Sequence, residues 1–206
     1  MSLEPAVPLP GVFSGVPQVV LADANVLYSR VLRDYLLYAA EYRLIAVVWS
    51  KAILAEVTEH LMANRPGFTV ESAARLTAAM AKAFPYAERN PGPADYQRLS
   101  HLSLPDEDDR HVLAAALAAE ADIICTSNLA DFPEPVATEL DLSVMTPDEL
   151  LCRLIAAAPA VMLLVHETSV ANLRDATDLS TIDALRRAGA SQAAEAVADL
   201  LAREVL

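Results

Sequence analysis

Short apolar runs alternate with longer segments of helical periodicity over the first three quarters of the chain. Four of these runs have the length and the residue types of buried strands, and they cover residues 19–22, 44–49, 121–125 and 142–145. Between them, apolar side chains recur at helical spacing, as in residues 31–39. Strands that alternate with helices predict an α/β sandwich with a mainly parallel sheet.

Polar residues mark the expected starts of several helices. Ser50 is a candidate N-cap for a helix through Leu61, and Thr69 is a candidate for a helix ending near Phe84. Thr146 and Glu149 have the spacing of a capping box, with proline at the first helical position between them.

The alternation stops after Pro159. Residues 160–206 predict two or three helices, with Ser180 and Ser191 as candidate caps, although residues 161–165 fit either a strand or a helix. Four prolines fall within the first seventeen residues. We therefore expect a flexible leader (1–18), an α/β domain (19–158) and a helical C-terminal extension (159–206).

Composition excludes several classes of protein. The chain has 206 residues, and its longest apolar run, residues 154–165, is interrupted by Pro159 and is too short for a bilayer span of roughly 20 residues. Two cysteines cannot form a disulfide framework, so we expect a cytoplasmic protein. No histidine pair has the spacing of a zinc site, and the five glycines form neither nucleotide-binding fingerprint.

The formal net charge of −13 is concentrated in one segment. Residues 104–149 carry twelve acidic side chains against Arg110 alone, whereas residues 1–103 carry nine acidic and nine basic side chains. Such a segment is either a solvated acidic face or a set of carboxylates for a hard divalent cation.

The positions of four polar residues favour the cation. Asp23 and Asn128 follow the first and third predicted strands, Glu56 lies one turn into a helix, and Asp109 begins the alanine-rich helix. Each alone has a structural explanation as a cap or a surface residue. In an alternating β/α order, however, they can converge on one sheet edge, where a shared divalent cation would relieve their repulsion.

Several strings around these residues resemble the PIN-domain nucleases, and among them the VapC-like toxin ribonucleases of toxin–antitoxin pairs. The strings are residues 21–29 (LADANVLYS), 49–56 (WSKAILAE), 104–113 (LPDEDDRHVL), 121–128 (ADIICTSN) and 131–133 (DFP). The resemblance spans about residues 19–155, and the helical tail is similar to tails on one branch of these proteins. It implies a PIN-like three-layer sandwich, with the nuclease domain at residues 19–158.

The resemblance also implies a ribonuclease dependent on Mg²⁺ or Mn²⁺. By motif matching, Asp23, Glu56 and Asp109 are the three metal-site acids, and Asn128 is the fourth catalytic position. The residues that would support them, or stand in for Asp109, are Asp106, Asp108, Asp131, Thr126 and Ser127. Asp23 and Asp109 would be direct ligands, and Glu56 would accept a proton from the attacking water.

RNA and protein partners follow from the same resemblance. Arg30 and Arg33, on the helix after Asp23, are candidate contacts to the RNA backbone. A toxin of this class is expected to bind a small antitoxin protein whose C-terminal segment enters the active-site groove, and a homodimer is expected as well.

We expect His111 to point to a different helical face from Asp109.

Two other functions compete with the metal-dependent nuclease. A phosphohydrolase with Asp23 as covalent nucleophile needs a second acid two residues later, and the chain has Asn25 there. The alternative that stays open is a catalytically weakened PIN-like scaffold that binds RNA or a protein partner.

Overall fold

The computed structural model describes residues 17–204 and contains a four-stranded parallel sheet. The strands are β1 (Gln18–Ala22), β2 (Ile45–Val48), β3 (Ile123–Cys125) and β4 (Ser143–Met145), in the spatial order β2-β1-β3-β4. All three pairings are parallel. The predicted α/β class is therefore confirmed, and each strand overlaps its predicted run, with β3 beginning two residues later than expected.

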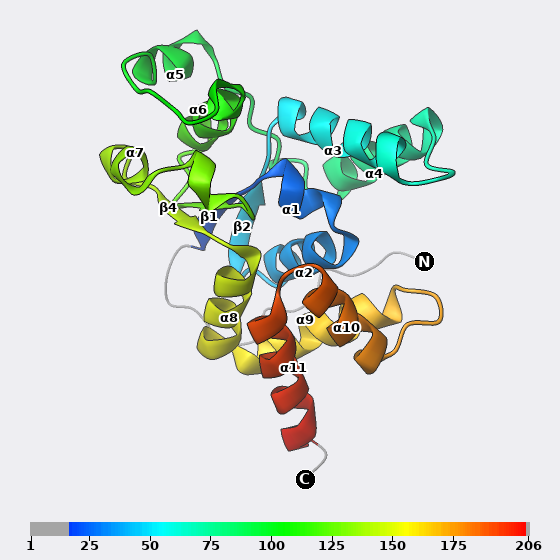
Figure 1. The fold of residues 1–206 in the computed structure, drawn as a ribbon. Coiled ribbons are helices and arrows are strands. Elements are labelled where there is room, and N and C mark those ends of the chain that lie inside the picture. The colour runs from blue at the N-terminus through cyan, green and yellow to red at the C-terminus, as the bar shows by residue number, and fades with distance from the viewer. Residues whose placement is uncertain (1–16, 205–206) are drawn as a thin grey trace.

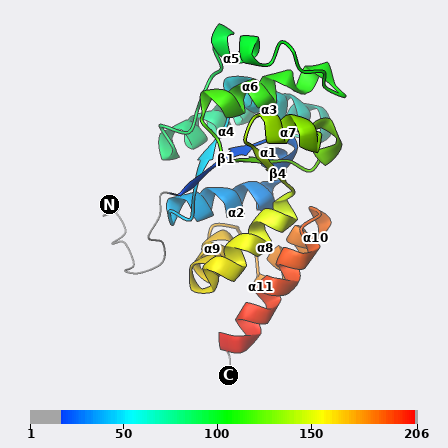
Figure 2. The same cartoon turned by 90° about the vertical axis from the view of Figure 1, so that its left-hand side faces the viewer.

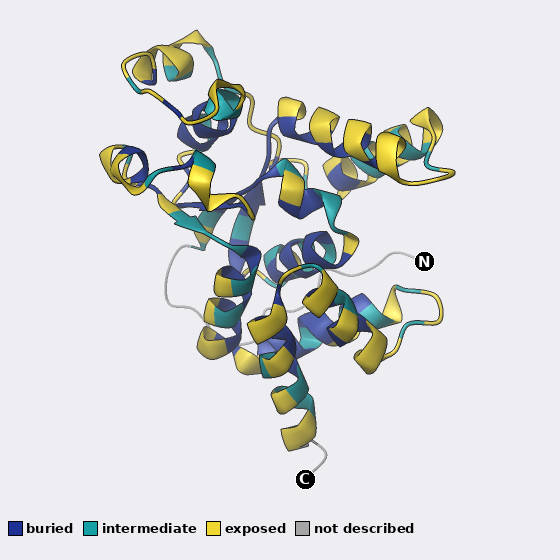
Figure 3. Ribbon diagram, viewed as in Figure 1, coloured by how far each residue is buried: buried dark blue, intermediate teal, exposed yellow. Residues whose placement is uncertain are grey.

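Helices cover both faces of this sheet. In both views α3 (Lys51–Asn64), α4 (Val70–Ala83) and α6 (Arg110–Ala118) lie on one side (Figures 1 and 2). On the other side lies α2 (Arg30–Glu41), followed by the C-terminal helices. Buried residues line the surfaces between these layers, and exposed residues lie on the outer helix faces (Figure 3).

The strand order creates a switch point between β1 and β3. The chain moves from β1 outward to β2, returns to the other side of β1 as β3, and then continues outward to β4. Ligands of open α/β sheets bind beyond the carboxyl ends of strands at such a point. The helix α1 (Ala24–Tyr28) begins there, with Asp23 as its N-cap.

The predicted helix starts agree with the structure. Ser50 accepts from the Ile53 N–H at 3.2 Å, and Thr69 accepts from the Ser72 N–H at 3.3 Å. Thr146 and Glu149 form the expected capping box at the start of α8 (Pro147–Ala157).

Three further helices follow α8 and pack outside the sheet. They are α9 (Pro159–Ala171), α10 (Asp178–Arg187) and α11 (Ser191–Glu204). The ambiguous residues 161–165 are therefore helical. α9 packs on α2 and α11 packs on α8, so the C-terminal helices complete the layer beneath the sheet.

The caps of the last two helices differ from those predicted. Thr177 caps α10 and Ser180 is its partner three residues later, bonded back to the Thr177 N–H. Ser191 is the first residue of α11, and Asp148 of α8 accepts from the N–H groups of Gln192 and Ala193 at 3.3 and 2.8 Å. A side chain distant in sequence thus performs the capping that we assigned to a local serine.

Several short elements were not predicted. They are α5 (Pro93–Arg98), α7 (Glu134–Glu139) and the 3₁₀ turns η1 (Glu107–Asp109) and η2 (Leu129–Asp131). Residues 1–16 of the predicted leader lie outside the described residues, and Gln18 already belongs to β1. Among the helices of residues 17–204, none combines the length and the apolarity that crossing a membrane requires.

The end of α6 provides a stability prediction. Glu120 has a positive φ of 50°, and the chain closes around it with bonds from Glu120 N to Leu117 O and from Ala121 N to Ala116 O. This Schellman geometry favours glycine, because a Cβ is strained in the left-handed region. Glu120→Gly should raise the free energy of unfolding by about 1 kcal/mol, measured by urea denaturation.

A matched control distinguishes this effect from the loss of a surface charge. Glu167 is exposed within α9, where glycine should instead cost about 1 kcal/mol. Equal losses of stability in Glu167→Gly and Glu120→Gly would show that Glu120 carries no backbone strain.

Candidate active site

A pocket of about 400 Å³ opens at the carboxyl ends of β1 and β3. Its walls come from α1, α3, η1 and the loop after β3. The lining residues are Asp23, Ala24, Asn25, Tyr28, Glu56, Glu59, His60, Asp109, Asn128 and Asp131. The structure therefore brings Asp23, Glu56, Asp109 and Asn128 to one pocket, together with Asp131.

Asp23 is the most firmly held of these side chains. It is 5% exposed, and its backbone N–H donates to Cys125 O at 3.0 Å, which places it beside the end of β3. Its carboxylate accepts from the Ala24 N–H at 2.6 Å, from Asn25 Nδ2 at 2.6 Å and from Thr126 Oγ1 at 2.7 Å. Burial raises the pKa of Asp23, although the bond from Thr126 opposes that rise.

Thr126 and Asn25 link the two strand ends. Thr126 Oγ1 also accepts from Asn25 Nδ2 at 2.9 Å and from the Asn128 N–H at 3.1 Å. Asn25 Oδ1 in turn accepts from the Ser127 N–H at 2.9 Å. In the sequence, Asn25 belongs to the string 21–29 and argues against a covalent phosphohydrolase. In the structure it also supports Asp23 and the loop after β3.

Asp109 and Asp131 form the acidic side of the pocket. Burial, the neighbouring Asp131 carboxyl and the charges of Asp23 and Asp106 together raise the pKa of Asp109 to about 6. The Asn128 amide donates to Asp131 Oδ2 and so fixes that carboxylate. Asp109 therefore lies among carboxylates that disfavour its ionisation.

Glu56 is paired with His111, a contact that the sequence did not predict. His111 Nε2 lies 2.8 Å from Glu56 Oε1, and this contact raises the pKa of His111. Asp109 ends the 3₁₀ turn η1 and lines the pocket, whereas His111 lies in α6, contacts Glu56 and is not among the lining residues. This difference is consistent with the expectation that the two side chains point to different faces.

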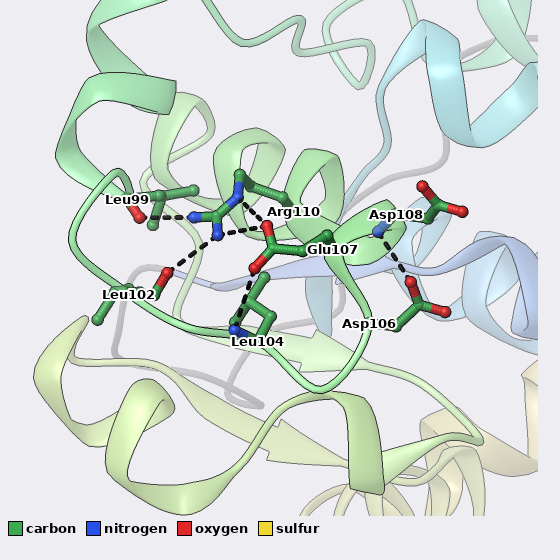
Figure 4. Close-up of polar contacts among 7 residues, drawn as sticks. All are labelled: Leu99, Leu102, Leu104, Asp106, Glu107, Asp108 and Arg110. Atoms are coloured by element: carbon green, nitrogen blue, oxygen red, sulfur yellow. Dashed lines mark hydrogen bonds and ion pairs between the residues drawn. The ribbon is translucent and has the colours of Figure 1, made fainter.

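A separate network holds the loop that leads to Asp109. The Arg110 guanidinium donates to the carbonyls of Leu99 and Leu102 at 2.6 and 2.9 Å, and Arg110 Nε donates to Glu107 at 2.8 Å (Figure 4). The only basic residue of the acidic segment is therefore used to fix its backbone.

Not every predicted site residue lines the pocket. Asp106 accepts from the Asp108 N–H at 2.9 Å and caps η1 (Figure 4); neither it nor Asp108 lines the pocket. Arg30 is exposed at the start of α2. Arg33, in contrast, is 8% exposed and donates to the Leu27 carbonyl at 2.7 Å, so its burial contradicts the predicted contact to RNA.

The donor set has the chemistry of a hard-cation site. Asp23, Glu56, Asp109 and Asp131 offer carboxylate oxygens, the ligands that Mg²⁺ and Mn²⁺ prefer, and their mutual repulsion is relieved by a positive charge. Within residues 17–204, no three His, Cys, Asp or Glu side chains already lie close enough to enclose a metal. The chemistry of these side chains therefore fits a divalent cation, although the side chains are spaced more widely than the ligands of a bound metal.

Comparison with known proteins adds a family. A family model described as PIN domain matches residues 19–130, just over half of the chain. The matched region includes Asp23, Glu56, Asp109 and Asn128, and it ends before the C-terminal helices. Searches of curated proteins and of solved structures found no match.

Proposed function

Because the chain belongs to the PIN domain family, we propose that it is a divalent-cation-dependent endoribonuclease that hydrolyses RNA phosphodiester bonds. PIN domains are generally nucleases and typically use divalent metals. The observation that carries the proposal is the pocket at the sheet switch point, where the buried Asp23 accepts three hydrogen bonds. Four further carboxylates line this pocket, those of Glu56, Glu59, Asp109 and Asp131.

Asp23, Asp109 and Asp131 are the residues that would hold the cation. When bound there, Mg²⁺ or Mn²⁺ would neutralise charge on the scissile phosphate and favour ionisation of water. Asp23 is suited to this role because donors from Ala24 and Thr126 fix its carboxylate before any ligand arrives.

Glu56 is the proposed proton acceptor. His111 Nε2 holds Glu56 Oε1 at 2.8 Å, which orients the carboxylate at the wall of the pocket. The Glu56 side chain is 46% exposed and lines the pocket, so a water molecule there can reach its carboxylate. Thr126 and Asn128 would keep the loop after β3 at a fixed distance from Asp23.

We further propose that the protein is the VapC-like toxin of a type II toxin–antitoxin pair and that it forms a homodimer. The strings around Asp23, Glu56 and Asp109 support this role, and the acidic pocket would accept a basic side chain from an antitoxin segment. Growth arrest on expression without the antitoxin tests the toxin role.

Cleavage of labelled RNA tests the nuclease directly. The purified protein should cut single-stranded RNA when Mg²⁺ or Mn²⁺ is present, and excess EDTA should stop the reaction because the acids lose their shared cation. A DNA strand of the same sequence, run beside it on the gel, tests the specificity for RNA.

The same experiment separates the nuclease from the alternative function. The opposite result is a protein that retains RNA in a mobility-shift gel without cutting it, equally with Mg²⁺ and with EDTA. That result would overturn the proposed nuclease function and favour the catalytically weakened scaffold. The pairing of Glu56 with His111 is the observation that favours that alternative, because it occupies one of the acids.

A further inference from the structure

A second pocket, of about 550 Å³, lies beside the acidic one. It is formed between the start of α2 and the C-terminal helix α10, and Tyr28 lines both pockets. The C-terminal helices lie beyond the matched family region, which ends at residue 130. This pocket is therefore made jointly by the family domain and by the extension of this particular chain.

Two arginines place positive charge at the second pocket. Arg30 comes from the first turn of α2 and has only a long contact of 3.6 Å with Asp34. Arg187 ends α10, is exposed, and forms no ion pair within residues 17–204. In a chain of net charge −13, two arginines that line one pocket indicate a site for an anion.

The start of α2 adds hydrogen-bond donors to this charge. The first N–H groups of a helix have no intrahelical partner, and they favour anions. Ser29, which precedes α2 and lines the pocket, makes no side-chain capping bond in the part of the chain that the structure describes.

An unpaired buried hydroxyl gives an independent indication of a ligand. Thr181 of α10 lines the same pocket and is 2% exposed, yet its Oγ1 has no hydrogen-bond partner within the described residues. Buried polar groups are nearly always paired, so each exception requires an explanation. The remaining wall is apolar, with Val31 and Ala184 among its residues, and suits a base or a ribose.

We propose that this pocket binds a nucleotide of the RNA strand next to the one that is cut, with its phosphate between Arg30 and Arg187. The inference rests on the proposed ribonuclease function. Tyr28 provides the continuity, because it lines both pockets and a strand that leaves the acidic pocket beside this residue would reach the second pocket. The C-terminal extension thus becomes part of the substrate-binding surface.

Arg187→Gln tests this subsite without touching the catalytic machinery. With a long single-stranded RNA, the variant should raise KM roughly threefold to tenfold at unchanged kcat, because a phosphate contact in both ground and transition states is lost. The slope of log Kd against log salt should fall by about 1. A dinucleotide, which fills only the acidic pocket, should be cleaved as well by the variant as by the wild type.

Arg186→Gln is the matched control. Arg186 is adjacent and exposed, but it is paired with Asp183 at 2.8 Å and does not line the pocket, so its removal should leave both substrates unaffected. Thr181→Val removes the buried hydroxyl at nearly constant volume, and it should weaken binding of the long RNA without lowering the melting temperature.

The outcomes separate this inference from the proposed function. Equal kinetics of Arg187→Gln and Arg186→Gln on the long RNA, in a wild type that cleaves it, would overturn the subsite alone. An equal loss on the dinucleotide would also overturn it, since the effect would not come from a neighbouring nucleotide. A wild type that neither binds nor cuts RNA would overturn both proposals.

Discussion

Asp23→Asn is expected to lower RNA cleavage about a thousandfold, the equivalent of roughly 4 kcal/mol of transition-state stabilisation. The change removes a hard ligand and one charge from the pocket. It also disrupts the support of the site, because Asn25 Nδ2 and Thr126 Oγ1 both donate to Asp23 Oδ2. The amide nitrogen of asparagine at that position is itself a hydrogen-bond donor, so it could not accept from these two groups.

The same variant should separate metal binding from folding. The melting temperature of the wild type should rise on titration with Mg²⁺ or Mn²⁺. A hundredfold excess of the cation over its Kd should add about 2.7 kcal/mol to the free energy of unfolding. Asp23→Asn should gain far less. Without metal it should be less stable by about 1–3 kcal/mol, because the buried Thr126 hydroxyl and the more exposed Asn25 amide lose their acceptor.

Asp141→Asn provides the control for this titration. Asp141 is exposed and precedes β4, at the end of the strand remote from the site. Its positive φ of 56° is one that asparagine tolerates. Metal-induced shifts of equal size in the wild type, Asp141→Asn and Asp23→Asn would remove Asp23 from the set of metal ligands.

The sequence predicted the strand ends of the site well because they depend on local patterns. A short buried run must stop where a charged residue follows, as at Asp23, and parallel strands present their carboxyl ends at one edge. Two such strand ends therefore sufficed to predict that Asp23 and Asn128 lie close together. The neighbouring order of β1 and β3, which the hydrophobic pattern does not specify, came only from the structure.

The missed features depend on geometry that a periodic pattern does not contain. The His111–Glu56 pair joins α6 to α3, and the packing of one helix beside the other is not contained in the pattern of either. Arg33 is charged and does not belong to the apolar pattern of its helix. It is nevertheless buried, because its guanidinium donates to the Leu27 carbonyl. Both are tertiary effects on polar residues, for which hydropathy gives no signal.

A buried histidine joins the C-terminal extension to the sheet domain. His166 of α9 is 0% exposed; its Nδ1 lies 2.6 Å from the Tyr35 hydroxyl of α2, and its Nε2 lies 3.1 Å from Asp178 Oδ1 of α10. Burial lowers the pKa of His166, while Asp178 opposes that shift. Both contacts are satisfied when the neutral ring carries its proton on Nε2, donates to Asp178 and accepts from Tyr35.

His166→Leu is expected to lower the free energy of unfolding by about 2–3 kcal/mol at pH 7.5. The loss arises because the buried Tyr35 hydroxyl, whose pKa burial raises so that it stays protonated, loses its acceptor. The variant should also remove part of the acid sensitivity of the protein. Below the unfolded pKa of about 6.5, the unfolded chain takes up a proton that the folded wild type excludes, so wild-type stability falls as the pH falls.

The difference between variant and wild type is the measurement that isolates His166. Asp109 and His111 have raised pKa values and favour the folded state at low pH, but both proteins contain them, so their contributions cancel. Urea denaturation at pH 7.5 and pH 5.5 should show the gap between wild type and His166→Leu narrowing by about 1 kcal/mol on acidification. His101→Leu, at a site with 60% exposure, should stay within about 0.5 kcal/mol of the wild type at both pH values. A gap that is constant or that widens at pH 5.5 would mean that His166 is already charged in the folded protein, and the neutral bridge between Tyr35 and Asp178 would be wrong.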